Sequence, residues 1–193
     1  MSETSLHIAC KEKIETNKTK LIELIKASTP DMWKVIDKYG NTPFHEACEY
    51  QKDPEMFKLM LEHGAISTWK IQNKYGYTPF HNACGDRKKA EVFKIMFTHG
   101  AKSTWKVQDE KGATPFHYAC QYQKDPEVFK LMLEHGANST WNIKNKKGHI
   151  PFWYACQNQK DPEVYKIMLE NGAISTLEIK TIEGMTPFHV ACL

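Results

Sequence analysis

The heptapeptide TPFHEAC at residues 42–48 decides the fold, because it returns at a constant interval of 36 residues. The copies are TPFHNAC at 78–84, TPFHYAC at 114–120, IPFWYAC at 150–156 and TPFHVAC at 186–192. A period of this length is typical of one supersecondary unit repeated along an open stack, in which each unit buries its apolar face against its neighbours. We therefore expect a core that runs along the stack, rather than a globule with one centre.

Each copy is expected to start a short helix. Thr42 is a favourable N-cap residue, and Pro43 suits the first helical position, where a missing N–H costs nothing. The turn signals at residues 51–54 limit this helix to about two turns. One face should pack and the other should point outward: the first holds Phe44, Ala47 and Cys48, and the second holds Glu46, Glu49 and Tyr50.

A second helix is expected from the triplet Asp-Pro-Glu at residues 53–55, which recurs at 125–127 and 161–163. Gly64 should end it with a positive φ. Residues 69–72 alternate apolar and polar side chains, as an extended segment does, and a turn follows them. The predicted unit is helix, turn, helix and extended finger.

These motifs resemble the ankyrin repeat, whose usual pattern includes Thr-Pro-Leu-His-x-Ala, a second helix similar to Glu-Val-Val-Lys-Leu-Leu-Leu, and Gly-Ala before a β-hairpin. The match is close at residues 114–119, 127–133 and 136–137. The resemblance covers nearly the whole chain and implies an all-α helix-turn-helix solenoid with extended hairpin fingers. The period departs from the ordinary repeat of roughly 33 residues, with one extra residue between the helices and two more in the finger.

We expect a single repeat domain over residues 1–193, divided at 1–36, 37–72, 73–108, 109–144, 145–180 and 181–193. The first unit is atypical, since residues 6–10 resemble residues 44–48 at an offset of 38, and its many polar residues suit a solvent-facing cap. The last unit stops within its first helix. It is either a half-repeat cap or the end of a fragment, and the apolar Phe188, Val190 and Leu193 favour the fragment.

Composition limits the kinds of partner and location. The 26 Lys and Arg residues against 23 acidic residues give a net charge of +3, too small for a generic binder of phosphate backbones. No apolar run approaches the roughly 20 residues that span a bilayer. The first five residues lack a basic segment followed by an apolar one. We expect a cytoplasmic or nuclear protein that is neither secreted nor bound to a membrane.

The cysteines form a column along the predicted stack. Packed helices lie about 8–10 Å apart, whereas a disulfide needs Cα atoms within roughly 4.4–6.8 Å. Buried free thiols in a reducing compartment are therefore expected. The column comprises Cys48, Cys84, Cys120, Cys156 and Cys192, with Cys10 as the counterpart in the first unit.

The histidines of the repeated heptapeptide form a second column. Zinc needs three or four ligands at about 2.0–2.3 Å from one point, whereas a column with one histidine per unit spreads them apart. The resemblance implies that these histidines hold the turn through hydrogen bonds. We expect no metal and no cofactor. The histidines are His45, His81, His117 and His189, and Trp153 takes the position in the remaining unit.

A tryptophan column could have either of two roles. Exposed, it would be an aromatic binding strip, and buried, it would pack the fingers against the helices. An apolar column two residues further on favours packing, because large aromatic side chains contribute most when buried. The column is Trp33, Trp69, Trp105 and Trp141, continued by Leu177.

The tyrosines indicate a binding surface more clearly than the cysteine, histidine and tryptophan columns do. Seven of the eight lie at predicted finger tips or on the outward stripe of first helices, where the resemblance places partner contacts. Tyrosine offers a large contact area at small conformational cost. Tyr118 and Tyr154 could instead pack between neighbouring first helices. With finger-tip lysines beside them, the predicted partner-binding residues are Tyr39, Asn41, Tyr50, Lys74, Tyr75, Tyr77, Lys111, Tyr118, Tyr122, Lys147, His149 and Tyr154.

The sequence thus predicts a monomeric, non-enzymatic scaffold that binds a protein partner along its concave face and finger tips. It carries no glycine-rich phosphate loop, and its histidines and cysteines repeat by register rather than gathering at one site. Two alternatives stay open. The lysine row at the tips could bind nucleic acid or another acidic ligand, or the chain could be the binding module of a larger enzyme or effector.

Overall fold

The computed structural model describes residues 3–12 and 14–192, and these contain helices and loops without a strand. The first helices of successive units are α1 (Ser5–Lys11), α4 (Pro43–Tyr50), α6 (Pro79–Gly85), α8 (Pro115–Tyr122), α10 (Pro151–Asn158) and α12 (Pro187–Ala191). The second helices are α2 (Ile14–Lys26), α5 (Pro54–Glu62), α7 (Ala90–Thr98), α9 (Pro126–Glu134) and α11 (Pro162–Glu170). A short helix α3 (Pro30–Trp33) and the 3₁₀ helices η1 (Ala65–Thr68), η2 (Ala101–Thr104), η3 (Ala137–Thr140) and η4 (Ala173–Thr176) lead into the fingers.

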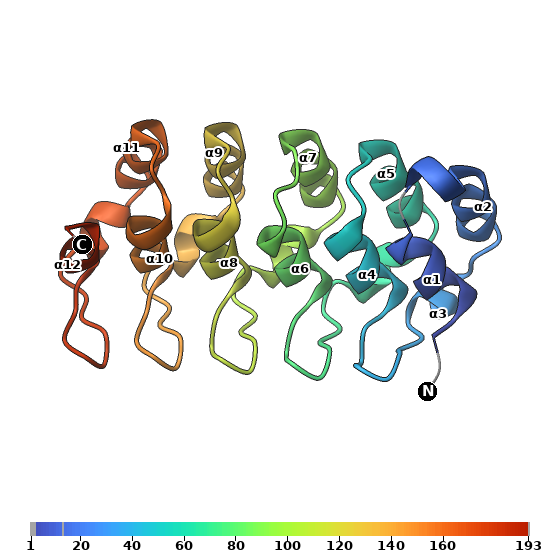
Figure 1. Cartoon of the computed structure of the whole chain (residues 1–193), viewed down its shortest axis with the longest axis horizontal. Helices are drawn as coiled ribbons and strands as arrows, with labels where there is room; N and C mark the ends of the chain where they lie inside the picture. Colours follow the sequence, from blue (N-terminus) through green and yellow to red (C-terminus); the bar gives the residue numbers. More distant parts are fainter. Residues whose placement is uncertain (1–2, 13, 193) are drawn as a thin grey trace.

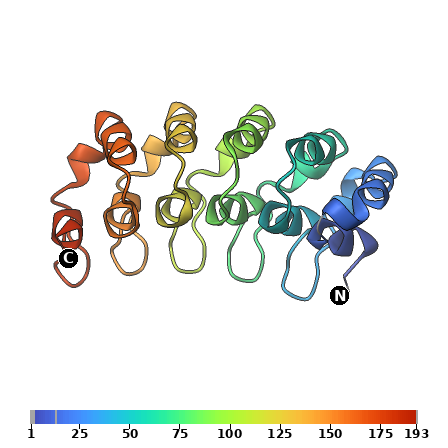
Figure 2. The same cartoon turned by 45° about the horizontal axis from the view of Figure 1, so that its top comes forward.

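The helices form two parallel rows, and the fingers extend from one side of them (Figure 1). Each first helix packs against the next first helix, from α1 through α12, and each second helix packs against the next second helix. The turned view shows the same rows and the finger loops side by side (Figure 2). The predicted all-α repeat solenoid is confirmed.

Local sequence signals start and end the helices where they were predicted. Thr42 Oγ1 accepts a hydrogen bond from the backbone N–H of His45 at the start of α4. Asp53 Oδ1 accepts one from Glu55 N–H at the start of α5. Gly64 follows α5 with φ +109°, which a residue without Cβ adopts at little cost.

The tryptophan column is buried, so its packing role is confirmed. Trp105 is 3% exposed and lies edge-on to Phe80, with ring centroids 4.8 Å apart. Its Nε1–H donates to the carbonyl of His135 in the next unit at 2.9 Å. Trp33, Trp69 and Trp141 make the same bond to His63, His99 and Asn171. The column therefore joins each finger to the end of the following second helix.

The prediction of an extended segment over residues 69–72 is wrong at its first residue, Trp69. Trp69 has φ −50° and ψ −33°, a helical conformation, and it directly follows η1. Thr68 Oγ1–H donates to the carbonyl of Ala65 at 2.7 Å and holds that helical turn. Residues 69–70 form a turn, residues 71–73 have no regular secondary structure, and the finger is a loop without strand pairing.

The cysteines are free, as expected, and four of them are buried, namely Cys10, Cys48, Cys84 and Cys120. Burial raises the pKa of the Cys48 thiol well above its usual range. Cys156 is only partly buried and Cys192 is exposed. The expectation of burial is wrong at Cys192, because no described helix packs over the outer side of α12 as α8 packs over α6.

The loop before α7 carries a buried lysine that the repeat pattern does not predict. Lys88 is 2% exposed, and its ammonium donates to the carbonyl of Gln51 at 2.7 Å and to Asp86 Oδ2 at 3.0 Å. In the following units a glutamine amide makes the corresponding link between loops, as when Gln159 Nε2–H donates to the carbonyl of Gln123 at 2.9 Å. Lys88 therefore keeps the loop-to-loop bond in the unit where Arg87 takes the place of the glutamine.

Candidate functional site

A buried aspartate or asparagine organises the tip of each of the first four fingers. Asn73 Oδ1 accepts hydrogen bonds from the backbone N–H groups of Tyr75 at 2.9 Å and Tyr77 at 3.0 Å. Gly76, with φ +78°, lets its own N–H reach the carbonyl of Asn73 at 2.9 Å. The tip is therefore held by its own hydrogen bonds. The same side-chain contacts recur at Asp37, Asp109 and Asn145.

Neighbouring tips are joined by backbone hydrogen bonds, which keep the tip side chains in a row. Because each finger is tied to the next, a residue at one tip has a fixed position relative to its counterpart. The bonds run from the N–H groups of Lys74, Glu110, Lys146 and Ile182 to the carbonyls of Tyr39, Tyr75, Lys111 and Lys147, at 2.9, 3.0, 2.8 and 3.3 Å respectively.

The histidine column ties each first helix to the following finger. His45 Nδ1 accepts a hydrogen bond from Thr42 N–H at 3.1 Å, and its Nε2 lies 2.9 Å from the carbonyl of Tyr77. Burial lowers the pKa of His45 to about 4, as it does for His81 and His117. These imidazoles are therefore neutral near pH 7. The hydrogen-bonding role implied by the resemblance is what the structure shows at these positions.

A hollow of about 460 Å³ lies over α4, α6 and α8, beside the finger tips. Tyr75 and Tyr122 are exposed, with 53% and 42% of their surface accessible. Tyr77 and Tyr118 form its half-buried wall. The hollow thus combines fixed aromatic walls with accessible aromatic edges. Its remaining lining consists of Asn41, Glu49, Asn73, His81, Asn82, Gly85 and Asp86.

Tyr118 is fixed by hydrogen bonds. Its hydroxyl donates to Asp109 Oδ2 at 2.6 Å and lies 3.1 Å from the hydroxyl of Tyr77. Burial and the bonded carboxylate raise the pKa of Tyr118 far above its usual range, so the hydroxyl stays protonated. Tyr122 stacks on Tyr118 with ring centroids 6.4 Å apart and planes 15° from parallel. The exposed Tyr122 ring therefore rests on an immobilised one.

A second hollow, of about 630 Å³, adjoins the first and is lined by cations. Lys111, Lys146 and Lys147 are exposed at its rim. His149 stacks on Trp153 with ring centroids 3.7 Å apart, and Tyr154 accepts a hydrogen bond from Asn145 Nδ2–H at 3.0 Å.

Tyr77, Tyr118 and Tyr122 line both hollows. We refer to the two adjoining hollows together as the groove.

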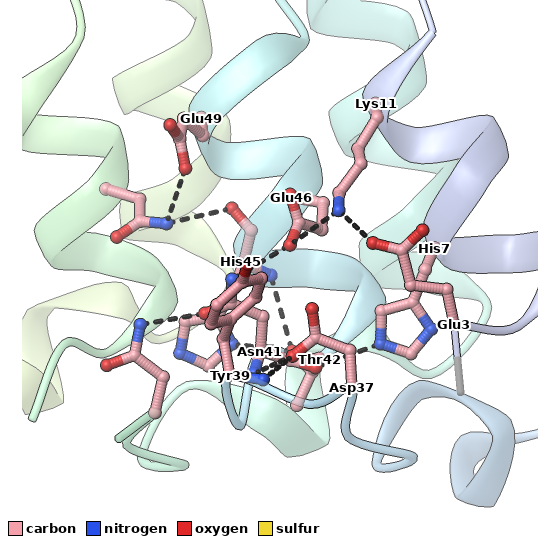
Figure 3. A network of polar contacts seen from close by, with 12 residues as sticks. Glu3, His7, Lys11, Asp37, Tyr39, Asn41, Thr42, His45, Glu46 and Glu49 are labelled. Atoms are coloured by element: carbon pink, nitrogen blue, oxygen red, sulfur yellow. Dashed lines mark hydrogen bonds and ion pairs between the residues drawn. The ribbon is translucent and has the colours of Figure 1, made fainter. Parts of the chain in front are cut away.

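Beside the end of the groove nearest α1 lies a polar network that contains the carboxylates of Glu3, Asp37, Glu46 and Glu49 (Figure 3). Glu46 was expected to point outward, but it is only 2% exposed. That expectation is wrong because Asn41 Nδ2–H donates to Glu46 Oε1 at 2.9 Å and Lys11 Nζ lies 3.5 Å from the same oxygen. Burial raises the pKa of Glu46. Asp37, in the same network, is 2% exposed, and its Oδ2 has no hydrogen-bond partner.

The structure brings together most, but not all, of the predicted partner-binding residues. Tyr39, Tyr50 and Lys74 are exposed but line neither hollow. Tyr118 and Tyr154 both contact the core and line the groove, so each combines the two roles considered for it. The predicted residues that line the groove are Asn41, Tyr75, Tyr77, Lys111, Tyr118, Tyr122, Lys147, His149 and Tyr154.

Sequence reasoning missed several groove residues, notably Glu49, Asn82 and Gln121. Asn82 Nδ2–H donates to the carbonyl of His45 at 3.2 Å and so bridges neighbouring first helices. The repeat alignment could have revealed Asn82, because it occupies the same position in its unit as Tyr118 does in the next. Comparing this position across units would have marked it as part of the same surface.

Two other kinds of site were sought in the described residues. Within 3–12 and 14–192, no three His, Cys, Asp or Glu side chains are placed so that they could hold a metal ion. None of the helices that the structure describes has the length and apolar character needed to cross a membrane.

Comparisons with known proteins agree with this architecture. Family models described as "Ankyrin repeats (3 copies)" and "Ankyrin repeats (many copies)" match residues 53–143 and 6–61. Among solved structures, the chain is similar to the crystal structure of the ankyrin repeat domain of Bcl-3, described as a unique member of the IkappaB protein family. The two are 24% identical with a TM-score of 0.69, over 98% of this chain and 78% of that chain. This likeness shows the fold. No curated protein matches the sequence.

Proposed function

Since the chain belongs to the ankyrin repeat family, we propose that it is a non-enzymatic scaffold or adaptor that binds a protein partner in its groove. Ankyrin repeats generally mediate protein–protein interaction. The proposed partner-binding residues are those that line the groove, while Tyr39, Tyr50 and Lys74 would contact only a partner that extends beyond it. In this proposal one copy of the chain suffices to form the site.

The observation that carries the proposal is the pairing of exposed and immobilised tyrosines. Tyr122 rests on Tyr118, and Tyr75 lies 6.3 Å from Tyr77, measured between ring centroids. Immobilised aromatic surfaces lose little conformational freedom on binding. The groove therefore offers aromatic contact area that is already in position for a partner.

A second candidate function is binding of single-stranded nucleic acid by the cationic part of the groove. Lys111, Lys146 and Lys147 beside aromatic rings would suit a phosphate backbone with stacked bases. The exposed carboxylate of Glu49 at the other end of the groove argues against it, because it would repel phosphates. Salt dependence distinguishes the two functions, since phosphate contacts make log affinity fall steeply and linearly with log salt concentration.

We further propose a cytoplasmic or nuclear location. The support is the buried, unpaired state of Cys10, Cys48, Cys84 and Cys120, which suits a reducing compartment. Fractionation of cells that express a tagged chain would test this. Recovery from the secretory pathway would contradict it.

The binding function can be tested with peptides selected from a random dodecapeptide library displayed on phage. The selected peptides should bind the unchanged protein, and the Tyr75→Ala/Tyr122→Ala variant should weaken their binding by about tenfold or more. Both tyrosines are exposed, so the variant should melt like the unchanged protein. Tyr77 is unsuitable for this test because its ring contacts His81 and Tyr118.

A matched control replaces exposed apolar residues outside the groove. Ile66 and Ile174 are 46% and 64% exposed and line neither hollow. The Ile66→Ala/Ile174→Ala variant should bind the selected peptides as the unchanged protein does. Equal binding by the tyrosine variant, or a comparable loss in the isoleucine variant, would refute the groove as the binding site.

A further inference from the structure

The groove changes its charge from one end to the other. Near α4 its lining includes Glu49 with the amides of Asn41 and Asn82, and near α10 it includes Lys146 and Lys147. Tyr77, Tyr118 and Tyr122 lie between these ends and line both hollows. A partner that fills the groove would therefore meet opposite charges at its two ends.

The acidic end has more carboxylates than its neighbouring cation can neutralise. Lys11 forms an ion pair with Glu3 as well as lying near Glu46, so its charge is shared. Glu49 adds a further, exposed carboxylate, which receives a hydrogen bond from Asn82 Nδ2–H at 3.4 Å. The buried Asp37 adds another carboxylate near Glu46. This end therefore has an excess of negative charge.

A comparison between units shows what the acidic end lacks. In a later unit, Tyr118 supplies a hydroxyl proton to Asp109 Oδ2. Glu46 occupies the position of Tyr118, and Asp37 occupies that of Asp109. A carboxylate has no proton to donate. The buried Asp37 Oδ2 accordingly has no partner. The acidic end thus has the carboxylate of Glu46, a hydrogen-bond acceptor, at the position where the later unit has the hydroxyl of Tyr118, a hydrogen-bond donor.

Not every acid in the groove contributes to this excess. Asp86 lies 3.0 Å from the buried ammonium of Lys88 and 3.9 Å from Lys52. Its charge is therefore compensated within the protein, and Glu49 is the acidic residue of the first hollow whose exposed charge forms no ion pair with a residue that the structure describes.

The opposite end has an excess of positive charge. None of Lys111, Lys146 and Lys147 forms an ion pair with a residue that the structure describes. Glu110 is the one acidic side chain that lines the same hollow. Three exposed ammonium groups against one carboxylate would attract an acidic side chain.

We propose that the groove binds an extended peptide with a lysine or arginine at one end, seated at the exposed Glu49, and an aspartate or glutamate at the other, seated among Lys111, Lys146 and Lys147. Opposite charges at fixed places determine which way a peptide lies along the stack, because the reversed peptide would meet like charges. This inference rests on the proposed function and specifies the chemistry of the partner.

The repeat spacing sets the separation of the two charges on the peptide. Packed helices are about 8–10 Å apart, and three such steps separate Glu49 on α4 from the tip that precedes α10. An extended chain advances roughly 3.3–3.6 Å per residue. The basic and acidic residues of the peptide should therefore be about five to nine residues apart. The lower value applies if the acidic residue contacts Lys111, which is one unit nearer to Glu49, and the higher value applies if it contacts Lys146 or Lys147.

The test is a selection from a random dodecapeptide phage library on the unchanged protein and on two charge-reversed variants. Glu49→Lys reverses the exposed carboxylate of the acidic end, and Lys146→Glu/Lys147→Glu reverses the basic end. All three side chains are exposed, and thermal unfolding verifies that the variants fold. Sequencing the selected pools gives the frequency of charged residues at each peptide position.

On the unchanged protein, peptides with a basic residue near one end and an acidic residue near the other should be enriched about threefold or more over peptides without that order. Glu49→Lys should abolish the basic preference and keep the acidic one. Lys146→Glu/Lys147→Glu should do the reverse. Selected pools without charge order, or a basic preference that survives Glu49→Lys, would overturn the inference.

The outcomes separate this inference from the proposed function. Peptides that bind without charge order but lose binding to Tyr75→Ala/Tyr122→Ala would leave the groove as a peptide site and refute only the charge arrangement. If the library yields no binding peptides, or if the selected peptides bind the Tyr75→Ala/Tyr122→Ala variant as tightly as the unchanged protein, both the proposed function and the charge arrangement are refuted. A fluorescent oligodeoxythymidine that displaced the selected peptides at physiological salt would also overturn the inference in favour of nucleic-acid binding.

Discussion

The hydroxyl of Tyr118 lies 2.6 Å from Asp109 Oδ2, so a residue of the first helix α8 satisfies the buried carboxylate that organises the preceding finger. This bond links the aromatic wall of the groove to the finger tip. It also fixes the protonation of Tyr118, because a proton donor to a carboxylate resists ionisation. The groove and the fingers are therefore stabilised by the same contacts.

Tyr118→Phe should lower the free energy of unfolding by about 1–3 kcal/mol, because the buried Asp109 Oδ2 would lose its donor. Urea unfolding at neutral pH measures the change. Tyr122→Phe, which alters an exposed ring of the same helix, is the matched control and should change stability by less than about 0.5 kcal/mol. Equal effects of the two substitutions would show that the hydroxyl bond contributes little.

Asp37→Asn should leave stability unchanged or raise it by about 1 kcal/mol. Asn73 and Asn145 occupy the same register and organise their fingers through Oδ1, so the tip should persist. The new amide would supply a donor in place of the unpartnered Oδ2 and remove a carboxylate near Glu46. The pKa of Glu46, followed by NMR, should fall. A loss of stability above about 1 kcal/mol would contradict this explanation.

Stability should decrease as the pH falls from about 6.5 towards 4. Burial holds the pKa of His45, His81 and His117 at about 4 in the folded protein, below the ordinary value of 6.5. The unfolded chain therefore takes up protons first, so the contribution of these histidines is complete above about pH 6.5 and is lost as the pH approaches 4.

Each of the three histidines should contribute about 2 kcal/mol to this loss between about pH 7 and pH 4.5. Urea unfolding across the range measures it. His81→Gln should be less stable near pH 7 and should show a shallower dependence on pH. A slope unchanged by that substitution would mean that His81 is not the titrating group.

Gly76→Ala should destabilise the protein more than Gly184→Ala. The two glycines have φ of +78° and +80°, so each substitution carries a backbone strain of about 1–2 kcal/mol. A Cβ at Gly76 would lie 2.6 Å from the backbone N of Glu110, whereas one at Gly184 would meet nothing within 4 Å. Because the backbone strain is similar in both variants, the difference between their losses of unfolding free energy measures the effect of close packing between neighbouring fingers at Gly76. Equal losses would indicate that the tips are not in close contact.

The positions of the helices could be predicted because their signals are local. Thr42, Pro43 and Gly64 act within one unit, and the constant period repeats them. The burial of Trp105 was also predictable, since a column of large aromatics two residues from an apolar column favours a core position. Such features depend on residues whose neighbours are known from the sequence alone.

The features that could not be predicted depend on contacts between units. Glu46 lies on the outward stripe of α4 by helical spacing, and it is buried because α1 and the finger at Asn41 cover it. Lys88 is buried because its loop replaces the glutamine that links neighbouring loops elsewhere. The helical conformation of Trp69 continues η1, and from there its Nε1–H reaches the carbonyl of His99 in the next unit. Helical and strand periodicity carry no signal for these contacts.

Hydrogen–deuterium exchange of the unchanged protein, with and without a library-selected peptide, tests the groove most directly. Binding should slow exchange at the finger tips and first helices that line the groove, around residues 73–82, 110–122 and 145–157. Exchange in the second helices α7 and α9 should change little. Slower exchange confined to those second helices, with the tips unaffected, would contradict the assignment of the binding surface.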